Sequence, residues 1–196
     1  YEIMPSLVGS EMCIRDRPKF KRLLVARFNL LPELRRRIGY EINMAKAGKE
    51  ARIILKMNAL QDPAMIDELY KASEAGVKID LIVRGICCLI PNQPYSRNIR
   101  ITRIVDSFLE HARVWYFHHG GKPLLFMGSP DWMRRNLYRR IEAVTPILDE
   151  DLKQQLIDML AIQLKDNRKA GWVDENLNNV LKRLSLIHIS EPTRLG

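Results

Sequence analysis

The sequence predicts an α/β fold in which helices and strands alternate along the chain. Residues 51–57 and 78–83 are short apolar runs, which are typical of strands buried on both faces of a sheet. The segment between them, residues 63–75, begins after Asp62, a residue type that caps helices, and ends before Gly76. A strand, a helix and a second strand in this order predict one parallel βαβ unit.

A further helix precedes this unit, and a less regular series of elements follows it. The first helix is predicted over residues 31–49, where Leu34, Ile38 and Ile42 recur at helical spacing. After the unit, the sequence predicts a strand at residues 99–104, a short helix that ends near His111, strands at residues 113–118, 124–128 and 140–147 with a hairpin turn at Gly120 and Gly121, and a closing helix that Asp149 caps and that runs to about Lys165.

The two ends of the chain differ from the middle. Residues 184–194, LSLIHISEPTR, can be encoded by a DNA string whose reverse complement, in another frame, reads LVGSEMCIRD, the sequence of residues 7–16. Two termini that translate opposite strands of one DNA cassette resemble a sequencing adaptor. We therefore expect residues 1–17 and 184–196 to be adaptor-derived and not native, and residues 18–183 to be a single-domain piece of a longer protein.

The charge of the chain favours a polyanionic partner. The sequence holds 32 lysines and arginines against 23 aspartates and glutamates, a formal net charge of +9. An excess of this size suits a nucleotide, a phosphate polymer, nucleic acid or an anionic membrane surface, and does not choose among them. No apolar run in the sequence approaches the roughly 18 residues of a membrane-spanning helix, so the simplest expectation is a cytoplasmic protein.

Three segments place polar side chains at the ends of apolar runs, where α/β sheets gather ligand-binding groups. They are IDLIVRGICCL at residues 79–89, SFLEHARVWYF at residues 107–117 and GSPDWMRRNLYRRIE at residues 128–142. The planar guanidinium of Arg84 suits phosphate geometry, and the imidazole of His111 can donate or accept a proton near neutral pH. The residues alone also allow a solvated arginine and a packed or capping histidine.

Together with the preceding stretch KMNALQDPAMIDELYKASEAGVK, these segments resemble the C-terminal catalytic domain of the bacterial polyphosphate kinases of the phosphohistidine type. The similarity runs from about Leu23 to Asn178. It implies a phospholipase-D-like domain, a mixed β-sheet flanked by helices, and a second such domain that faces a shared site. The implied activity is reversible transfer of the terminal phosphate of ATP to inorganic polyphosphate through a phosphohistidine.

The resemblance assigns roles to individual residues. Arg84, in the motif IVRG, matches the arginine that contacts the ATP phosphates. His111, in FLEH, matches an essential histidine that lines the nucleotide site and assists phosphoryl transfer, so it is the predicted catalytic residue. Supporting roles are implied for the polar positions that follow the histidine in phospholipase-D-like domains, here Ser129, Asn136, Arg140 and Glu142.

Other parts of the machinery are expected outside this chain. The histidine that the family phosphorylates lies in the preceding domain, and no HLGTGNYN-like motif occurs in this sequence. The resemblance implies Mg²⁺ in the full protein with its ligands upstream, so we expect no metal ligands here and no polyphosphate synthesis by this chain alone. It also implies ATP, ADP and polyphosphate as partners rather than nucleic acid, a homo-oligomeric full-length protein, and a cytoplasmic location with membrane association left open.

Two other interpretations remain. A phospholipase-D-like phosphodiesterase would need the motif HxK, whereas His111 and Arg113 form HxR, and it would need a second copy of the motif. A non-catalytic polyanion-binding module is the other, above all for the isolated chain.

Pro130 departs from the family pattern and removes one backbone N–H donor. Four arginines form either a polyphosphate track or an exposed basic face: Arg134, Arg135, Arg139 and Arg140.

Overall fold

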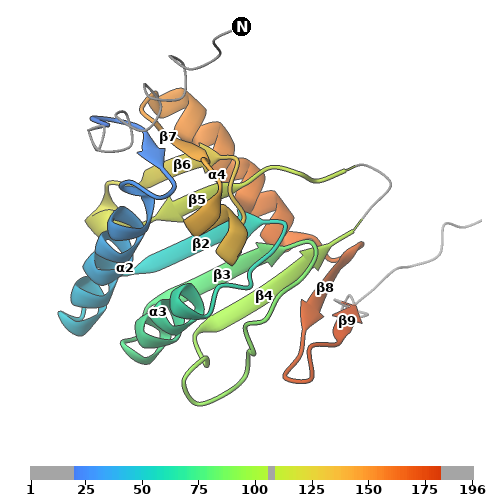
Figure 1. Cartoon of the computed structure of the whole chain (residues 1–196). Coiled ribbons are helices and arrows are strands. Elements are labelled where there is room, and N and C mark those ends of the chain that lie inside the picture. Colours follow the sequence, from blue (N-terminus) through green and yellow to red (C-terminus); the bar gives the residue numbers. More distant parts are fainter. Residues whose placement is uncertain (1–19, 106–108, 182–196) are drawn as a thin grey trace, which may run out of the picture.

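The structure is a computed structural model that describes residues 20–105 and 109–181 (Figure 1). One nine-stranded sheet crosses the molecule in the order β1-β7-β6-β5-β2-β3-β4-β8-β9. Strands β2, β3 and β4 pair in parallel and the other pairs are antiparallel, so the predicted mixed sheet is confirmed. The strands are β1 (Leu24–Val25), β2 (Arg52–Met57), β3 (Lys78–Val83), β4 (Ile99–Ile104), β5 (Val114–Phe117), β6 (Leu124–Gly128), β7 (Ala143–Ile147), β8 (Ala170–Val173) and β9 (Asn179–Leu181).

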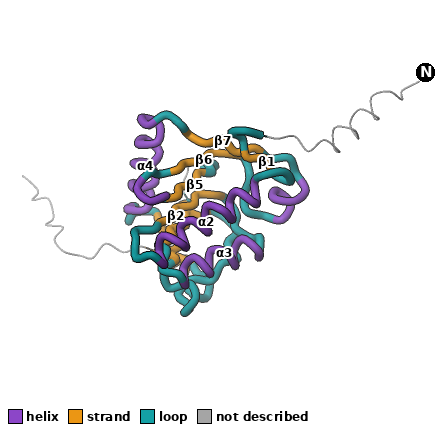
Figure 2. The backbone as a smooth tube through the Cα atoms, turned by 90° about the vertical axis from the view of Figure 1, so that its left-hand side faces the viewer, coloured by secondary structure: helices purple, strands orange, loops and turns teal. Residues whose placement is uncertain are grey.

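Helices cover both faces of the sheet. Figure 2 shows α4 (Glu150–Lys165) on one side of the strands and α2 (Leu30–Lys46) on the other, and α3 (Pro63–Glu74) lies beside α2. The side chains of β2 alternate between the two faces. Ile53 packs in the larger core with α2 and α3, whereas Ile54 packs in a smaller core beneath α4. The central strands are therefore buried on both faces, as their apolar sequences predict.

The βαβ unit follows from local signals. Asp62 Oδ1 accepts a hydrogen bond from the backbone N–H of Met65 at 3.1 Å, and Pro63 occupies the first turn of α3. This is the predicted N-terminal cap, which satisfies a donor that has no partner within the helix. After α3, β3 pairs in parallel with β2, with Val83 opposite Met57. The predicted unit is confirmed in both its elements and its pairing.

Several local predictions are wrong. The strand predicted at residues 140–147 begins only at Ala143, because Arg135–Arg139 form a π-helical turn, η2. The backbone N–H of Arg140 closes this turn by donating to the carbonyl of Arg135 at 2.9 Å. The predicted hairpin at Gly120 and Gly121, by contrast, is confirmed, because β5 and β6 pair in antiparallel and the turn that joins them, η1 (His119–Gly121), is a 3₁₀ turn. The short helix predicted before His111 falls partly on residues 106–108, outside the described residues, and residues 109–113 are not helical.

The direction of the strands decides where the polar segments meet. Because β2 and β3 are parallel, the residues that follow them, Asn58 and Arg84, lie at the same edge of the sheet. Strand β5 is antiparallel to β2 and therefore starts at that edge, directly after Arg113. By the same logic β6 ends there, before Ser129, and β7 starts there, after Glu142. One edge of the sheet thus receives all three polar segments of the sequence.

The close pairing at Gly128 gives a prediction about stability. A Cβ atom at Gly128 would lie 2.6 Å from the carbonyl oxygen of Ala143 and 2.6 Å from Cγ2 of Val144. We expect Gly128→Ala to lower the free energy of unfolding by about 1–3 kcal/mol, the usual effect of overpacking. Denaturant unfolding measures the change. The matched control is Gly39→Ala in α2, where a Cβ meets no atom within 4 Å and helix propensity predicts a gain of about 0.5–1 kcal/mol. Equal stability of the two variants would contradict the close approach.

Candidate functional site

The loops that follow β2 and β3 are tied together at Asn58. Arg84 Nε donates to Asn58 Oδ1 at 2.9 Å, and the backbone N–H of Gly85 donates to the Asn58 carbonyl at 2.8 Å. A Cβ atom at Gly85 would lie 2.9 Å from that carbonyl oxygen, so the two loops approach as closely as a glycine permits. Arg84 is half-buried, and its terminal nitrogens make no hydrogen bond to any described residue. One nitrogen positions the guanidinium, and the other two remain available.

A buried ion pair joins the start of β5 to the loop after β6. Arg113 Nε donates to Asp131 Oδ1 at 3.2 Å, and Arg113 Nη2 donates to Asp131 Oδ2 at 3.0 Å. Only 13% of the Arg113 side chain and 11% of the Asp131 side chain are exposed. Asp131 Oδ1 also accepts from the backbone N–H groups of Asn58, at 2.8 Å, and Ala59, at 3.2 Å. Asp131 therefore connects β5 to the loop after β2 as well.

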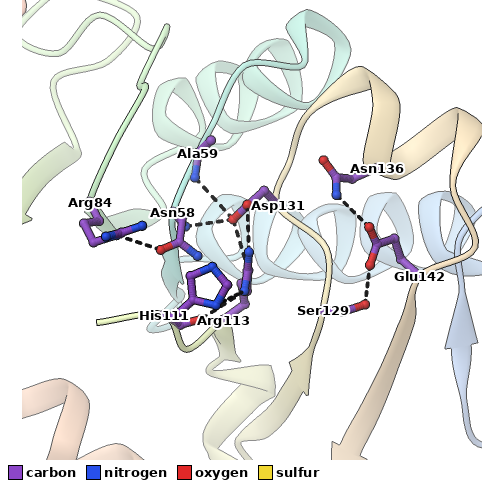
Figure 3. A network of polar contacts seen from close by, with 9 residues as sticks. All are labelled: Asn58, Ala59, Arg84, His111, Arg113, Ser129, Asp131, Asn136 and Glu142. Carbon is purple, nitrogen blue, oxygen red and sulfur yellow. Dashed lines mark hydrogen bonds and ion pairs between the residues drawn. The ribbon is translucent and has the colours of Figure 1, made fainter. Parts of the chain in front are cut away.

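His111 attaches to the same structure through Arg113. Arg113 Nη1 lies 3.0 Å from His111 Nδ1 and donates to the His111 carbonyl at 3.0 Å. Figure 3 shows Arg84, Asn58, His111, Arg113 and Asp131 joined in one series of contacts. We call these five residues the Arg84–His111 network. The imidazole of His111 is exposed, so the network presents this ring to solvent at the edge of the sheet.

The loop of His111 has a second anchor, on the face that α4 covers. Lys56 in β2 is only 3% exposed, and its ammonium group forms an ion pair with Glu110. Gln163 in α4 bridges the two, because it accepts from Lys56 at 2.9 Å and donates to Glu110 at 3.1 Å. A buried ammonium group needs such partners. The chain is thus fixed on both sides of His111, at Glu110 and at Arg113.

A second group of polar residues lies beyond the ion pair, and we call it the Glu142 cluster. The buried carboxylate of Glu142 accepts hydrogen bonds from Ser129 Oγ and from Asn136 Nδ2, the latter at 2.7 Å. Figure 3 shows this cluster separate from the Arg84–His111 network. Arg140 does not join it, because its side chain is exposed and makes no hydrogen bond or ion pair with any described residue. The structure brings together three of the four predicted supporting residues.

Sequence reasoning predicted Arg84 and His111 as site residues but did not predict the residues that hold them in place. Asn58 directly follows an apolar strand, just as Arg84 does. This position after the strand is the sequence signal from which Asn58 could have been predicted. Arg113 entered the prediction only as a departure from HxK. Asp131 lies within the third polar segment, and nothing local indicates its contacts to Asn58, which lies 73 positions earlier. All three are polar residues at the ends of strands.

The electrostatics of the site follow from these contacts. Burial on its own raises the pKa of Asp131, but Arg113 and the N–H groups of Asn58 and Ala59 outweigh burial and hold this pKa below its ordinary value. Asp131 is therefore ionised and offsets one arginine, while Arg84 keeps a positive charge at the edge. No group of three or more His, Cys, Asp or Glu residues that could hold a metal ion occurs in residues 20–105 and 109–181.

The lowered pKa of Asp131 predicts a pH-dependent contribution to stability. A carboxyl group whose pKa is lowered by folding stabilises the fold fully above its ordinary pKa, here 3.8, and loses this effect as pH falls through the folded-state value. Asp131→Asn should therefore lower the free energy of unfolding by about 1.5–3 kcal/mol at pH 7. The difference from the unsubstituted chain should shrink as the pH falls below 3.8. Denaturant unfolding at each pH measures it, with the exposed Asp67→Asn as control. A loss that does not change with pH would contradict the ionised pair.

Comparison with known proteins adds to this geometry. Residues 23–185 match the family model described as polyphosphate kinase C-terminal domain 2. The crystal structure of polyphosphate kinase from Porphyromonas gingivalis is similar with a TM-score of 0.85 and 54% identity, over 91% of this chain and 28% of that chain. Polyphosphate kinase of Vibrio cholerae serotype O1 is 48% identical over 162 residues, which are 82% of this chain and 23% of the relative. That of Synechocystis sp. is 49% identical over 165 residues, which are 84% of this chain and 23% of the relative.

A more distant likeness concerns the fold alone. Nuc from Salmonella typhimurium, a phospholipase D family member, is similar with a TM-score of 0.51 and 13% identity, over 75% of this chain and 96% of that chain. The predicted phospholipase-D-like fold is thereby confirmed. The chain spans about a quarter of the length of the curated relatives that it matches, since it covers 23% of each. With its family model matched over residues 23–185, the chain belongs to the polyphosphate kinase family and corresponds to its C-terminal domain 2.

Proposed function

We propose that this chain supplies the nucleotide- and phosphate-contacting part of a polyphosphate kinase active site. The reaction is reversible transfer of the terminal phosphate of ATP to inorganic polyphosphate. The observation that supports the proposal is the Arg84–His111 network, which fixes an arginine with free terminal N–H groups and an exposed histidine at one edge of the sheet. Membership of the polyphosphate kinase family supplies the reaction class.

The chemistry suits this arrangement. Phosphoryl transfer spreads negative charge over the equatorial oxygens, so catalysis depends mainly on positioning and on electrostatic stabilisation. The two terminal nitrogens of Arg84 can donate to two phosphate oxygens at once, which is the strongest geometry for this pair of groups. His111 is the predicted catalytic residue and contacts an oxygen of the transferred group or of the leaving group. The Glu142 cluster, with Ser129 and Asn136, supports the loop that carries Asp131.

The remaining machinery is assigned to sequence outside this chain. The histidine that becomes phosphorylated and the ligands of Mg²⁺ belong to an upstream domain, and the native protein is a cytoplasmic homo-oligomer. Membrane association is left open; among the helices that the structure describes, none is long and apolar enough to cross a bilayer. Residues 1–17 and 184–196 are adaptor-derived in this proposal, and residues 18–183 make no polyphosphate alone.

A second function, binding of polyanions without catalysis, fits the isolated chain. The net charge of +9 attracts polyphosphate and nucleotides alike. All four arginines of the predicted track are exposed, which suits either a polyphosphate track or a solvated basic face: Arg134, Arg135, Arg139 and Arg140. A phosphodiesterase activity receives no such support, because the likeness to Nuc concerns the fold alone.

The catalytic assignment is tested in a complete enzyme. Residues 23–185 of this chain replace the matching segment of Porphyromonas gingivalis polyphosphate kinase, and polyphosphate synthesis from ATP is measured. We expect an active chimaera in which His111→Ala lowers kcat by about 10²–10⁴, the usual range for a group that acts in the transition state. Arg84→Ala should lower kcat/KM for ATP by at least about tenfold, the loss of one charged hydrogen bond. The control is Arg97→Ala, an exposed arginine before β4 at the opposite edge. Full activity of both site variants would overturn the proposal.

The isolated chain gives a separate prediction about binding. Diffuse attraction between the basic chain and ATP or polyphosphate should fall steeply with salt and change little in single variants. A preformed half-site should add a salt-resistant component that Arg84→Ala removes and Arg97→Ala leaves in place. Isothermal titration of the 196-residue chain at low and high salt separates the two. Binding that is wholly salt-sensitive and indifferent to both substitutions would favour the polyanion-binding module.

A further inference from the structure

Arg113 contacts two residues, Asp131 and His111, through different nitrogens of its guanidinium. The three nitrogens of its guanidinium make four contacts. Two reach the carboxylate of Asp131, at 3.2 and 3.0 Å. The other two belong to Nη1 and reach the carbonyl oxygen and Nδ1 of His111, both at 3.0 Å. The carboxylate thus fixes the plane of the guanidinium, and that plane fixes the direction of the Nη1 donors.

This contact decides which nitrogen of His111 carries the proton. An arginine side chain only donates and does not lose its proton in proteins. His111 Nδ1 must therefore accept, which requires a lone pair on Nδ1 and places the proton of the neutral ring on Nε2. A proton on Nδ1 would point its N–H at the N–H of Nη1, and in the doubly protonated ring it would also place two cations in contact. The neutral ring with its proton on Nδ1 and the doubly protonated ring would both lose the hydrogen bond from Arg113.

We propose that Arg113 is a positioning residue that holds His111 in the neutral tautomer with its proton on Nε2. The inference rests on the proposed function, because it says how the predicted catalytic histidine acts. His111 Nε2 has no hydrogen-bond partner among the described residues, and the ring is exposed. Its N–H is therefore free to donate to a phosphate oxygen.

The tautomer limits the role of His111 in phosphoryl transfer. A neutral imidazole does not give up its remaining N–H proton at physiological pH, so His111 does not act as a proton donor to the leaving phosphate. It donates a hydrogen bond through Nε2 to an oxygen on which charge develops, and the proton stays on the ring. Such fixed donors stabilise the transition state because they need no reorganisation as charge builds up. Arg113 acts only through His111, and its charge is offset by Asp131.

The tautomer can be observed in the chain itself. Nitrogen-15 NMR of histidine-labelled protein at neutral pH distinguishes a bare from a protonated ring nitrogen, and His111→Gln assigns the His111 signals. We expect a bare Nδ1 and a protonated Nε2 for His111, and a mixture of the two tautomers in Arg113→Ala. Unchanged signals of His118 and His119 will show that the variant is folded. A protonated Nδ1 in the unsubstituted chain, or no change in Arg113→Ala, would overturn the proposal.

Two further variants separate the loss of the contact to His111 from a general loss of stability. Arg113→Ala leaves Asp131 buried without its partner and destabilises the fold, so the double variant Arg113→Met/Asp131→Asn, which removes both charges, is measured beside it. The matched control is Arg103→Ala, because Arg103 lies at the same edge and donates to the carbonyls of Val83 and Gly85 without a contact to His111. The control should leave the His111 signals as they are, and a shift equal to that of Arg113→Ala would overturn the direct contact.

Activity of the chimaera tests the consequence for catalysis. Arg113→Ala should lower kcat by about 10-fold or more and change KM for ATP little, because a donor fixed for the transition state contributes there and not in the ground state. Arg113→Lys keeps the charge but lacks the planar fork that bonds Asp131 through Nε and Nη2 while Nη1 faces His111, so it should not rescue kcat. Rescue by lysine would overturn the positioning role. An inactive unsubstituted chimaera would count against the proposed function, whereas the NMR result judges the tautomer independently.

Discussion

The buried ion pair between Arg113 and Asp131 is the interaction on which the site depends. It joins the residue before β5 to the segment after β6, and through the N–H groups of Asn58 and Ala59 it also holds the loop after β2. Each charge alone would be costly to bury, and the bidentate geometry with two extra backbone donors offsets that cost. Three segments that are distant in sequence are thereby fixed at one edge of the sheet.

The mixed pairing of the sheet makes this arrangement possible. In a wholly parallel sheet, the residue before a strand lies at the edge opposite to the residue after its neighbour. Here β5 runs antiparallel to β2, so His111 and Arg113, which precede β5, meet Asn58 and Arg84, which follow β2 and β3. Strand direction thus sets the composition of the site before any side-chain contact forms.

Local sequence signals account for what could be predicted. Strand β3, the capped start of α3, and the cap of α4 at Asp149 follow from apolar runs and capping residues within a few positions. Strands β1, β8 and β9 have only two to four residues each, so their conformation depends on a neighbouring strand rather than on their own pattern. The residues of the candidate site likewise fall into those that a local motif indicates and those that only the fold brings together. Motifs indicate Arg84 and His111, but Asn58 and Asp131 are joined across 73 positions and become visible only in the fold.

Two ion pairs of opposite orientation hold the loop of His111. On the side of α4 the loop contributes the acid, Glu110, to the buried base Lys56, whereas on the other side it contributes the base, Arg113, to the buried acid Asp131. A shift of the loop toward either partner lengthens the contact with the other. The position of His111 is therefore determined by folding, and the entropy of ordering this loop is lost in the folding step itself. An exposed histidine on an otherwise irregular segment is thus preorganised, as the proposed role in phosphoryl transfer requires.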